Sequence, residues 1–298
     1  MSRLFSVVLG TALLGLAGVF LLSAPGSVDS AAYQRLTGDA TDGELVFWAA
    51  GCASCHAAPA ATGNEMLVLS GGQAFPSAFG TFLAPNISPD PTNGIGGWSL
   101  LQFANAVTMG VDPEGAHLYP ALPYAAYTKM QPQDVADLKA FMDTLPASAE
   151  PNKPHEIGFP FNIRRSLGVW KRLFVTNDWV ITGDLTPEQT RGRYIAEALA
   201  HCGECHTPRN ALGGLQRDNW LSGAATPDGK GKTPNITPGK LAWSEAEIVE
   251  YLTSGFTPAY DSVGGNMAHV VENMARLPEA DRKSVAAYLK LVPAVTVP

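Results

Sequence analysis

The sequence predicts an all-α protein, in which an N-terminal membrane helix precedes two similar helical domains in tandem. The motif C-x-x-C-H occurs twice, at residues 52–56 and at residues 202–206. Other landmarks recur in the same order after each motif, among them Asn86 as Asn235 and Trp98 as Trp243. Self-similarity of this kind indicates two copies of one folded unit. An unbroken apolar run at the N-terminus is long enough for a membrane helix.

The apolar run covers residues 4–22 and follows Arg3. The apolar region of a cleaved signal peptide has roughly 7–15 residues, whereas a membrane span needs roughly 17–25. The run therefore favours an uncleaved anchor, and residues 1–30 are expected to form the anchor and its tether. Cleavage of a signal peptide after Ser30 is the alternative. Both alternatives export the rest of the chain, which predicts a location on the periplasmic side of the bacterial inner membrane.

The first helical domain is expected at residues 31–146. A glycine- and proline-rich stretch, residues 59–93, predicts loops between its first two helices. Ser99 is placed as an N-cap and Gly110 just beyond a helix end. Met142 belongs to an apolar stripe and is expected in the core. The helices expected in this domain are residues 42–52, 98–108 and 131–145.

The second domain is expected at residues 184–298 and repeats this order, with helices at 186–199, 243–255 and 278–291. Residues 147–183 are expected to form a linker that contains a short amphipathic helix at 162–174. Its apolar stripe favours a connector packed between the two domains. The alternative is contact with anionic lipid or an acidic partner through its basic residues, Arg164, Arg165, Lys171 and Arg172.

Composition excludes one class of partner. Only 16% of the 298 residues are charged, and the formal net charge is −7. This acidic balance argues against a nucleic-acid partner. Glycine (30 residues) and proline (23 residues) are both abundant, as expected where long loops wrap a large cofactor.

The two C-x-x-C-H motifs predict two covalently bound haem c groups. Two thiols one helical turn apart can each add to a haem vinyl group, and the histidine after the second thiol can ligate the iron. The expected attachment and ligand residues are Cys52, Cys55 and His56 for one haem and Cys202, Cys205 and His206 for the other. A zinc site, a redox dithiol or structural disulfides would not explain a histidine after each pair. They also give no reason for all four cysteines to lie in these motifs.

The chain resembles the diheme and multiheme cytochrome c subunits of bacterial membrane-bound dehydrogenases that oxidise alcohols or sugar acids. The resemblance rests on both C-x-x-C-H motifs and on several further segments, which together cover most of residues 43–292. These segments are P-N-I-S-P at 85–89 with P-N-I-T-P at 234–238, G-I-G-G-W-S at 94–99, Y-P-A-L-P-Y at 119–124 and Y-T-K-M at 127–130. The resemblance implies that both domains are class I cytochrome c domains.

Each iron then needs a sixth ligand or an open position. The candidates are Met66, Met109, Met130, Met142 and His117 in the first domain, and Met267, Met274 and His269 in the second. The resemblance implies Met130, just before the closing helix, and Met267, just after a flexible Gly264-Gly265-Asn266 stretch. A methionine thioether raises the reduction potential and leaves no vacant site for substrate.

The function that follows is single-electron transfer without catalysis by this chain itself. The resemblance implies a periplasmic or membrane-bound dehydrogenase as electron donor. The acceptor would be an oxidase, a quinone-linked complex or a small cytochrome of the respiratory chain. The alternative is a diheme enzyme, either peroxidase-like or thiosulfate-oxidising. A peroxidase would need one iron with a displaceable sixth position, and thiosulfate enzymes of this type use a cysteine ligand outside the motifs, which this chain lacks.

Overall fold

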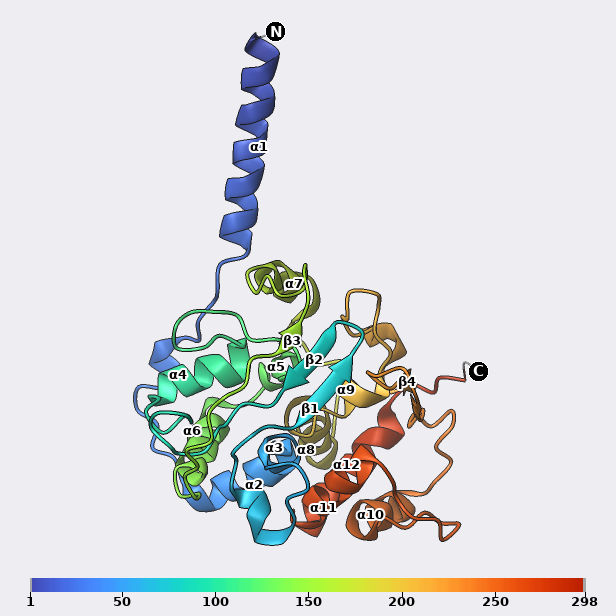
Figure 1. The fold of residues 1–298 in the computed structure, drawn as a ribbon. Coiled ribbons are helices and arrows are strands. Elements are labelled where there is room, and N and C mark those ends of the chain that lie inside the picture. Colours follow the sequence, from blue (N-terminus) through green and yellow to red (C-terminus); the bar gives the residue numbers. More distant parts are fainter. Residues whose placement is uncertain (1, 297–298) are drawn as a thin grey trace.

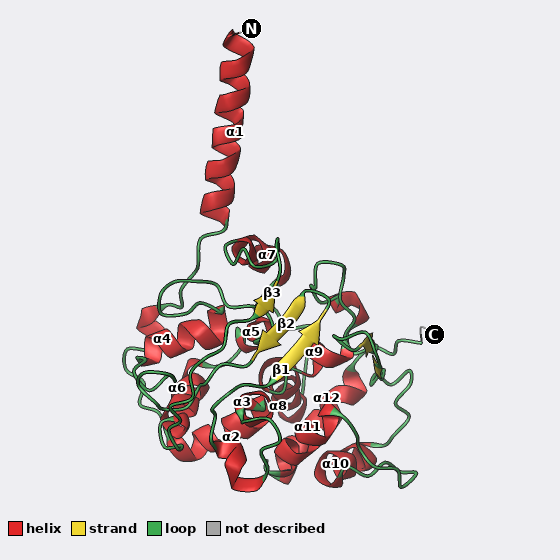
Figure 2. Cartoon of the chain, viewed as in Figure 1, coloured by secondary structure: helices red, strands yellow, loops and turns green. Residues whose placement is uncertain are grey.

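A computed structural model describes residues 2–296, and the chain is mostly helical (Figure 1 and Figure 2). Helix α1 projects away from a body in which the other elements pack together (Figure 1). Among the described residues, Phe5–Leu22 is the helical stretch long and apolar enough to cross a bilayer. The α-helices are α1 (Ser2–Leu22), α2 (Ala40–Ala50), α3 (Cys52–His56), α4 (Leu100–Ala104), α5 (Tyr124–Tyr127), α6 (Pro132–Met142), α7 (Ser166–Phe174), α8 (Pro187–Tyr194), α9 (Cys202–His206), α10 (Glu245–Ser254), α11 (Asn266–Ala275) and α12 (Glu279–Leu291).

Two small sheets correct the all-α expectation to a mostly helical fold. The strands are β1 (Ala74–Ser77), β2 (Gly80–Leu83), β3 (Glu156–Ile157), β4 (Ala224–Ala225) and β5 (Lys232–Thr233). The first three form an antiparallel sheet in the order β1-β2-β3, and β4 pairs with β5. Phe75 lies opposite Phe82 across β1 and β2, a cross-strand pairing that favours a hairpin. Residues 59–93 were expected to be loops because short hairpins rich in glycine and proline lack a clear alternating pattern.

Two helix pairs form the core, and they are equivalent in the two halves of the body, residues 31–146 and 184–298. Helix α2 packs on α6, and α8 packs on α12. Each crossing needs a glycine. A Cβ on Gly43 would overlap the backbone oxygen of Asp137, and a Cβ on Gly192 would overlap that of Ser284. The helices therefore approach backbone to backbone, and this close packing places both C-x-x-C-H motifs directly after a buried helix.

We expect Gly43→Ala and Gly192→Ala each to lower the free energy of unfolding by about 2–3 kcal/mol, because a methyl group must be forced into a packed crossing. Thermal unfolding followed by far-UV circular dichroism measures the change. Gly158→Ala is the matched control, since a Cβ there meets no atom within 4 Å. Equal stability of all three variants would show that the crossings have room for a side chain.

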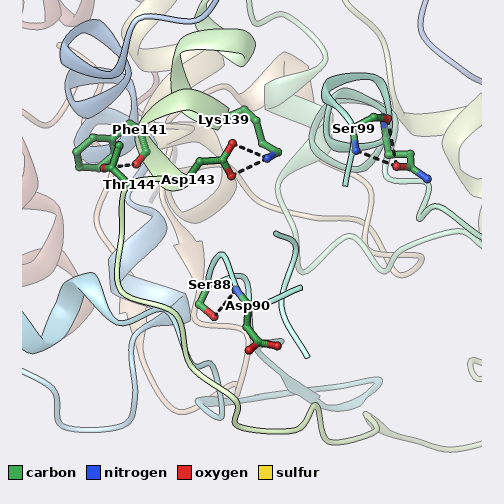
Figure 3. A network of polar contacts seen from close by, with 8 residues as sticks. Ser88, Asp90, Ser99, Lys139, Phe141, Asp143 and Thr144 are labelled. Atoms are coloured by element: carbon green, nitrogen blue, oxygen red, sulfur yellow. Dashed lines mark hydrogen bonds and ion pairs between the residues drawn. The ribbon is translucent and has the colours of Figure 1, made fainter. Parts of the chain in front are cut away.

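The helix ends explain why several boundaries could be predicted. Ser99 caps α4, where its hydroxyl accepts from the Gln102 amide and Gln102 reaches back to the Ser99 backbone (Figure 3). This capping box confirms Ser99 as the predicted N-cap. The helix then passes into a π-helical turn, η3 (Asn105–Met109), and ends at Gly110 in the left-handed region with φ +60°. Met142 is 3% exposed and lies in the core, as predicted.

The end of α6 is held by local polar contacts. Lys139 Nζ donates to the Asp143 carboxylate at 2.6 and 2.7 Å, and Thr144 Oγ1 donates to Phe141 O at 2.7 Å (Figure 3). Lys139 is almost fully buried, so the ion pair compensates a charge that would otherwise be costly in this environment. These contacts stabilise the last turn of the helix, just before the chain leaves for the linker.

Helix α7, at residues 166–174, contacts both halves of the body. Trp170 Nε1 donates to Leu212 O in the second half at 2.8 Å. Lys171 Nζ donates to Met109 O at 2.7 Å and to Gly110 O at 2.6 Å in the first half. Burial lowers the pKa of Lys171 to about 8, so its ammonium remains mostly protonated at neutral pH. One short helix therefore contacts both halves through neighbouring side chains.

Candidate haem-attachment sites

Each C-x-x-C-H motif forms one short helix, α3 or α9, directly after a buried helix of its half. The first cysteine of each motif is half-buried and the second is exposed, and all four thiols are free. Cys52 and Cys55 lie three residues apart on α3, so their side chains share one face of the helix, as do those of Cys202 and Cys205 on α9. This arrangement suits attachment of one planar group to both thiols of each pair.

The surroundings of the thiols do not complete a zinc site. Among the described residues, His, Cys, Asp and Glu side chains form no group of three that would hold a metal ion. Burial raises the pKa of Cys52 and of Cys202 to about 12, so the first thiol of each pair is protonated at neutral pH. Each pair therefore lacks the further donors that a structural zinc ion needs.

The motif histidines share one contact that prepares them as iron ligands. His56 Nδ1 lies 2.9 Å from Pro85 O, and His206 Nδ1 lies 2.8 Å from Pro234 O. A carbonyl oxygen only accepts, so Nδ1 carries the proton and the lone pair of Nε2 is free to ligate iron. Burial lowers the pKa of both histidines, which keeps the imidazoles neutral. We call this contact the histidine clamp.

The loops that present the clamp have the same hydrogen bonds in both halves. The amide of Gly71 donates to His56 O, and that of Gly223 donates to His206 O, each at 2.7 Å. The residue after the P-N dipeptide is held in the same way, because the Ile87 amide donates to Leu69 O and the Ile236 amide to Leu221 O, each at 3.0 Å. Each histidine is therefore fixed at both its backbone and its ring by one returning loop.

Asn86 and Asn235, the repeated asparagines of the P-N-I-S/T-P segments, stabilise turns. Their side-chain oxygens accept from the amides of Ser88 and Thr237, at 2.9 and 2.8 Å. Their amide groups donate to the chain that follows the closing helix, Asn86 to Ser148 O at 2.8 Å and Asn235 to Val295 O at 2.8 Å. The Ser88 hydroxyl also accepts from the Asp90 amide in the same turn (Figure 3). Both asparagines thus tie the end of each half to the clamp loop.

Arg209 follows the second motif and is engaged within the protein. It pairs with Glu204, the third residue of that motif, and donates to Gly213 O at 2.8 Å. Trp98 and Trp243 are partly buried against the core at the starts of their helices.

The predicted ligand Met130 is 6% exposed and lies in the hydrophobic core between α5 and α6. Its competitor His117 is placed elsewhere. His117 Nε2 lies 2.9 Å from Ser23 O, and its Nδ1 lies 3.1 Å from Lys171 Nζ. Both ring nitrogens are therefore occupied by protein partners, which removes His117 from the candidates. The prediction of Met130 remains.

The predicted ligand Met267 begins α11 and is partly buried against the core. Met274 lies seven residues later on the same helix and is 2% exposed, as expected of a core residue. His269 is about half exposed and lies near Glu272 on the surface. Of the three candidates, Met267 combines a partly buried side chain with a position on the turn that leads into the helix.

The two predicted methionines occupy different positions of the repeat. The amides of Leu118 and Val263 make equivalent hydrogen bonds, to Gly110 O and Gly255 O, and four residues after them come Leu122 and Met267. Just before the closing helix of the first half, the amide of Met130 donates to Tyr127 O. At the same place in the second half, the amide of Leu277 donates to Met274 O. Met130 therefore corresponds to Leu277, and Met267 to Leu122. The apparent sequence repeat hid this difference because the intervening helices, α5 and α11, differ in length.

The two motifs also contact each other's half of the body. Asn273 Nδ2 on α11 donates to the Oγ of Ser54, inside the first motif, at 2.9 Å. His201, just before the second motif, lies with Nε2 3.3 Å from Ala50 O, just before the first. Burial raises the pKa of Cys55, and the Cys205 thiol of the other motif adds to that rise because it is close. The two attachment sites therefore lie near one another in one packed body. The sequence contained no signal for these contacts.

The sites can now be compared with known proteins. The profile of the cytochrome c family matches residues 40–146. A diheme cytochrome c-type protein of Cereibacter sphaeroides is 54% identical over 97% of this chain and 99% of its own length. The fructose dehydrogenase cytochrome subunit of Gluconobacter japonicus is 39% identical over 85% of this chain. The gluconate 2-dehydrogenase cytochrome c subunit of Pantoea cypripedii is 32% identical over 83%. The chain spans 52% and 58% of the lengths of these two subunits.

Proposed function

Because this chain belongs to the diheme cytochrome c family, we propose that it is a membrane-anchored carrier of single electrons with two covalent haem c groups. One haem would be attached through Cys52 and Cys55 with His56 as iron ligand. The other would be attached through Cys202 and Cys205 with His206. Haem iron supplies one-electron chemistry, and its potential is tuned by the axial ligands and by burial.

The repeated histidine clamp is the observation that carries this proposal. A carbonyl at the same place in each half, Pro85 O or Pro234 O, fixes the tautomer and the direction of the motif histidine. Ligand histidines at metal centres depend on this kind of second hydrogen bond for orientation. A histidine that served only to fill the core would not need the same clamp twice. The neutral, fixed imidazoles suit an electron carrier, in which the protein binds and orients the cofactor.

We propose two class I cytochrome c domains, residues 31–146 and 184–298, joined by the linker 147–183. The equivalent helix crossings, clamp loops and capping residues of the two halves support this division. The sixth ligands are proposed to be Met130 and Met267, which would reach their irons from different positions of the fold. The contacts between the two motifs support transfer of electrons between the two haems.

The donor is proposed to be a periplasmic or membrane-bound dehydrogenase, since relatives of this chain are cytochrome subunits of fructose and gluconate dehydrogenases. The acceptor would be an oxidase, a quinone-linked complex or a small cytochrome of the respiratory chain. An acidic surface, with a formal charge of −7, suits association with basic patches on such partners.

An uncleaved N-terminal anchor, residues 1–30, is supported by how the end of α1 meets the body. Ser23 is 2% exposed, its backbone oxygen lies 2.9 Å from His117 Nε2, and its hydroxyl accepts from Arg165 Nε at 2.9 Å. Cleavage after Ser30 would remove these contacts and leave His117 and Arg165 without them. We therefore propose that the chain stays anchored, with its body on the periplasmic side of the inner membrane.

A potentiometric titration of the purified full chain, followed by its visible spectrum, tests the proposed function. We expect two one-electron steps, two low-spin haems and no turnover of hydrogen peroxide. As a control, Met267→Ala should open one iron and produce a high-spin signal, which shows that the method detects such a site. A high-spin haem or peroxide turnover in the unmodified chain would instead support the diheme enzyme.

A further inference from the structure

Helix α7 lies at the base of α1, where the candidate membrane span ends (Figure 1). Arg165 Nη2 donates to Phe20 O at 2.9 Å, and Arg172 Nε donates to Leu22 O at 2.6 Å. These carbonyls belong to the last turn of α1, which has no further helical amides to bond them. Two arginines of the body thus cap the membrane helix and sit at its negative dipole end.

The contact between α7 and the end of α1 is close enough to fix their relative orientation. A Cβ on Gly168 would overlap the backbone oxygen of Ser23. The Arg165 guanidinium also stacks on the Phe20 ring, 4.4 Å from its centroid. If α1 crosses a bilayer up to Leu22, α7 must therefore lie at the level of the lipid headgroups.

At this level the linker exposes large apolar side chains. The segment before α7 exposes Phe159 (81%), Phe161 (46%) and Ile163 (47%), and α7 itself exposes Leu173 (65%). Four such residues within 15 positions of one linker form a cluster that water does not favour. The buried residues of α7, Leu167 and Gly168, and the half-buried Lys171 already account for its contacts with the body and are not among these exposed side chains.

The same segment carries positive charge in a chain that is acidic overall. Arg164, Arg165 and Arg172 are interspersed with the exposed apolar residues. Arg164 lies over the Tyr119 ring and only 3.8 Å from Asp112, whereas Arg172 faces the end of α1. Basic and apolar residues mixed on one surface segment are typical of helices that lie in the interface of an anionic membrane.

We propose that Phe159, Phe161, Ile163, Arg164, Arg172 and Leu173 form a juxtamembrane face that rests on the anionic surface of the bilayer that α1 enters. The face and the span together would hold the body at one orientation, so that each haem site keeps a constant height above the membrane. This inference rests on the proposed anchor, because α1 sets the depth of α7.

The test is photolabelling of the full chain in nanodiscs of phosphatidylcholine, with or without phosphatidylglycerol, that contain a diazirine-bearing lipid. Peptide mapping then gives the lipid-contacting segments. We expect label in α1 and in residues 159–173. Each basic residue near an anionic surface contributes about 1 kcal/mol to the free energy of binding, which corresponds to about fivefold in affinity. The rise in labelling of 159–173 on addition of phosphatidylglycerol should therefore be about fivefold larger in the wild-type chain than in Arg164→Gln.

The combined variant Phe159→Ser, Ile163→Ser and Leu173→Ser should reduce labelling of 159–173 to background while α1 stays labelled. Phe161 is left unchanged because its ring packs on Phe79. The matched control is Phe256→Ser with Tyr260→Ser, which removes exposed apolar residues that follow α10, at the other end of the body from α1 (Figure 1). The control should leave both labels unchanged, and the visible spectra should show both haems in every variant.

Label in α1 without label in 159–173 would overturn the juxtamembrane face and leave the anchor intact. Absence of label from α1 would overturn the anchor, and the face with it. Shielding of 159–173 only when a dehydrogenase subunit is added would show a protein-docking surface instead, which also contradicts the proposal.

Discussion

The double variant Cys52→Ala/Cys55→Ala is expected to lose one haem completely and to keep the other. Without the two thiols no thioether bond can form, and His56 alone cannot hold a haem through denaturation and acid extraction. The second pair, Cys202 and Cys205, lies in a separate helix with its own histidine clamp, so its attachment should persist. Mass spectrometry of the denatured chain should show two haem additions in the wild-type protein and one in this variant.

The reciprocal variant Cys202→Ala/Cys205→Ala should lose the other haem. Ser54→Ala is the matched control, because Ser54 lies between the first pair and contacts Asn273 without taking part in attachment. It should keep both haems. Two additions in either double variant would contradict the assignment of the attachment residues, and none in the wild type would contradict haem c altogether.

Met267→His is expected to lower one of the two reduction potentials by an amount on the order of tenths of a volt. Axial ligands set haem potentials over roughly 0.8 V, and imidazole favours ferric iron more than a thioether does. The other redox wave should stay in place. Spectroelectrochemistry of the full chain measures both waves. Met274→Leu is the control, since a similar apolar volume replaces a core side chain and should leave both waves nearly unchanged.

Met130→His should lower the other wave in the same way. The repeat makes this prediction sharper, because Met130 and Met267 are not at equivalent positions and Leu122 corresponds to Met267. The double variant Met130→Leu/Leu122→Met therefore tests which of the two positions faces the first iron. Met130→Leu should remove one of the two contributions to the thioether charge-transfer band, because Met267 keeps the other. Recovery of full intensity in the double variant would show that the first iron is reached from the Leu122 position. Full wild-type intensity in Met130→Leu alone would show that Met130 is a core residue and that our first assignment is wrong.

Much of the helical framework could be predicted because its signals are local. Ser99 caps its helix through a capping box that involves only the next three residues, and Gly110 ends the helix in a conformation that suits glycine. The apolar run at the N-terminus predicts a helix by length and composition alone. Strand β3 was missed because it lies in the linker and pairs with β2 across more than 70 residues, so no local alternation marks it.

Residue types and their spacing are enough to predict the chemistry of the sites. Two thiols and an adjacent histidine, repeated once and using every cysteine of the chain, predict two haem c groups without any structure. The apolar run likewise predicted the N-terminal helix. These conclusions depend on residue types at short fixed spacing, and short spacing on a helix already implies a shared face.

How the sites are held and oriented depends on contacts between residues far apart in the sequence. Pro85 lies 29 positions after His56, Ser54 meets Asn273 across 219 positions, and Arg165 reaches the end of α1 across 145. Contacts at such separations depend on how the helices pack, which no local pattern encodes. For the same reason the structure alone separated His117 from the ligand candidates and showed that Met130 and Met267 lie at different positions of the repeat.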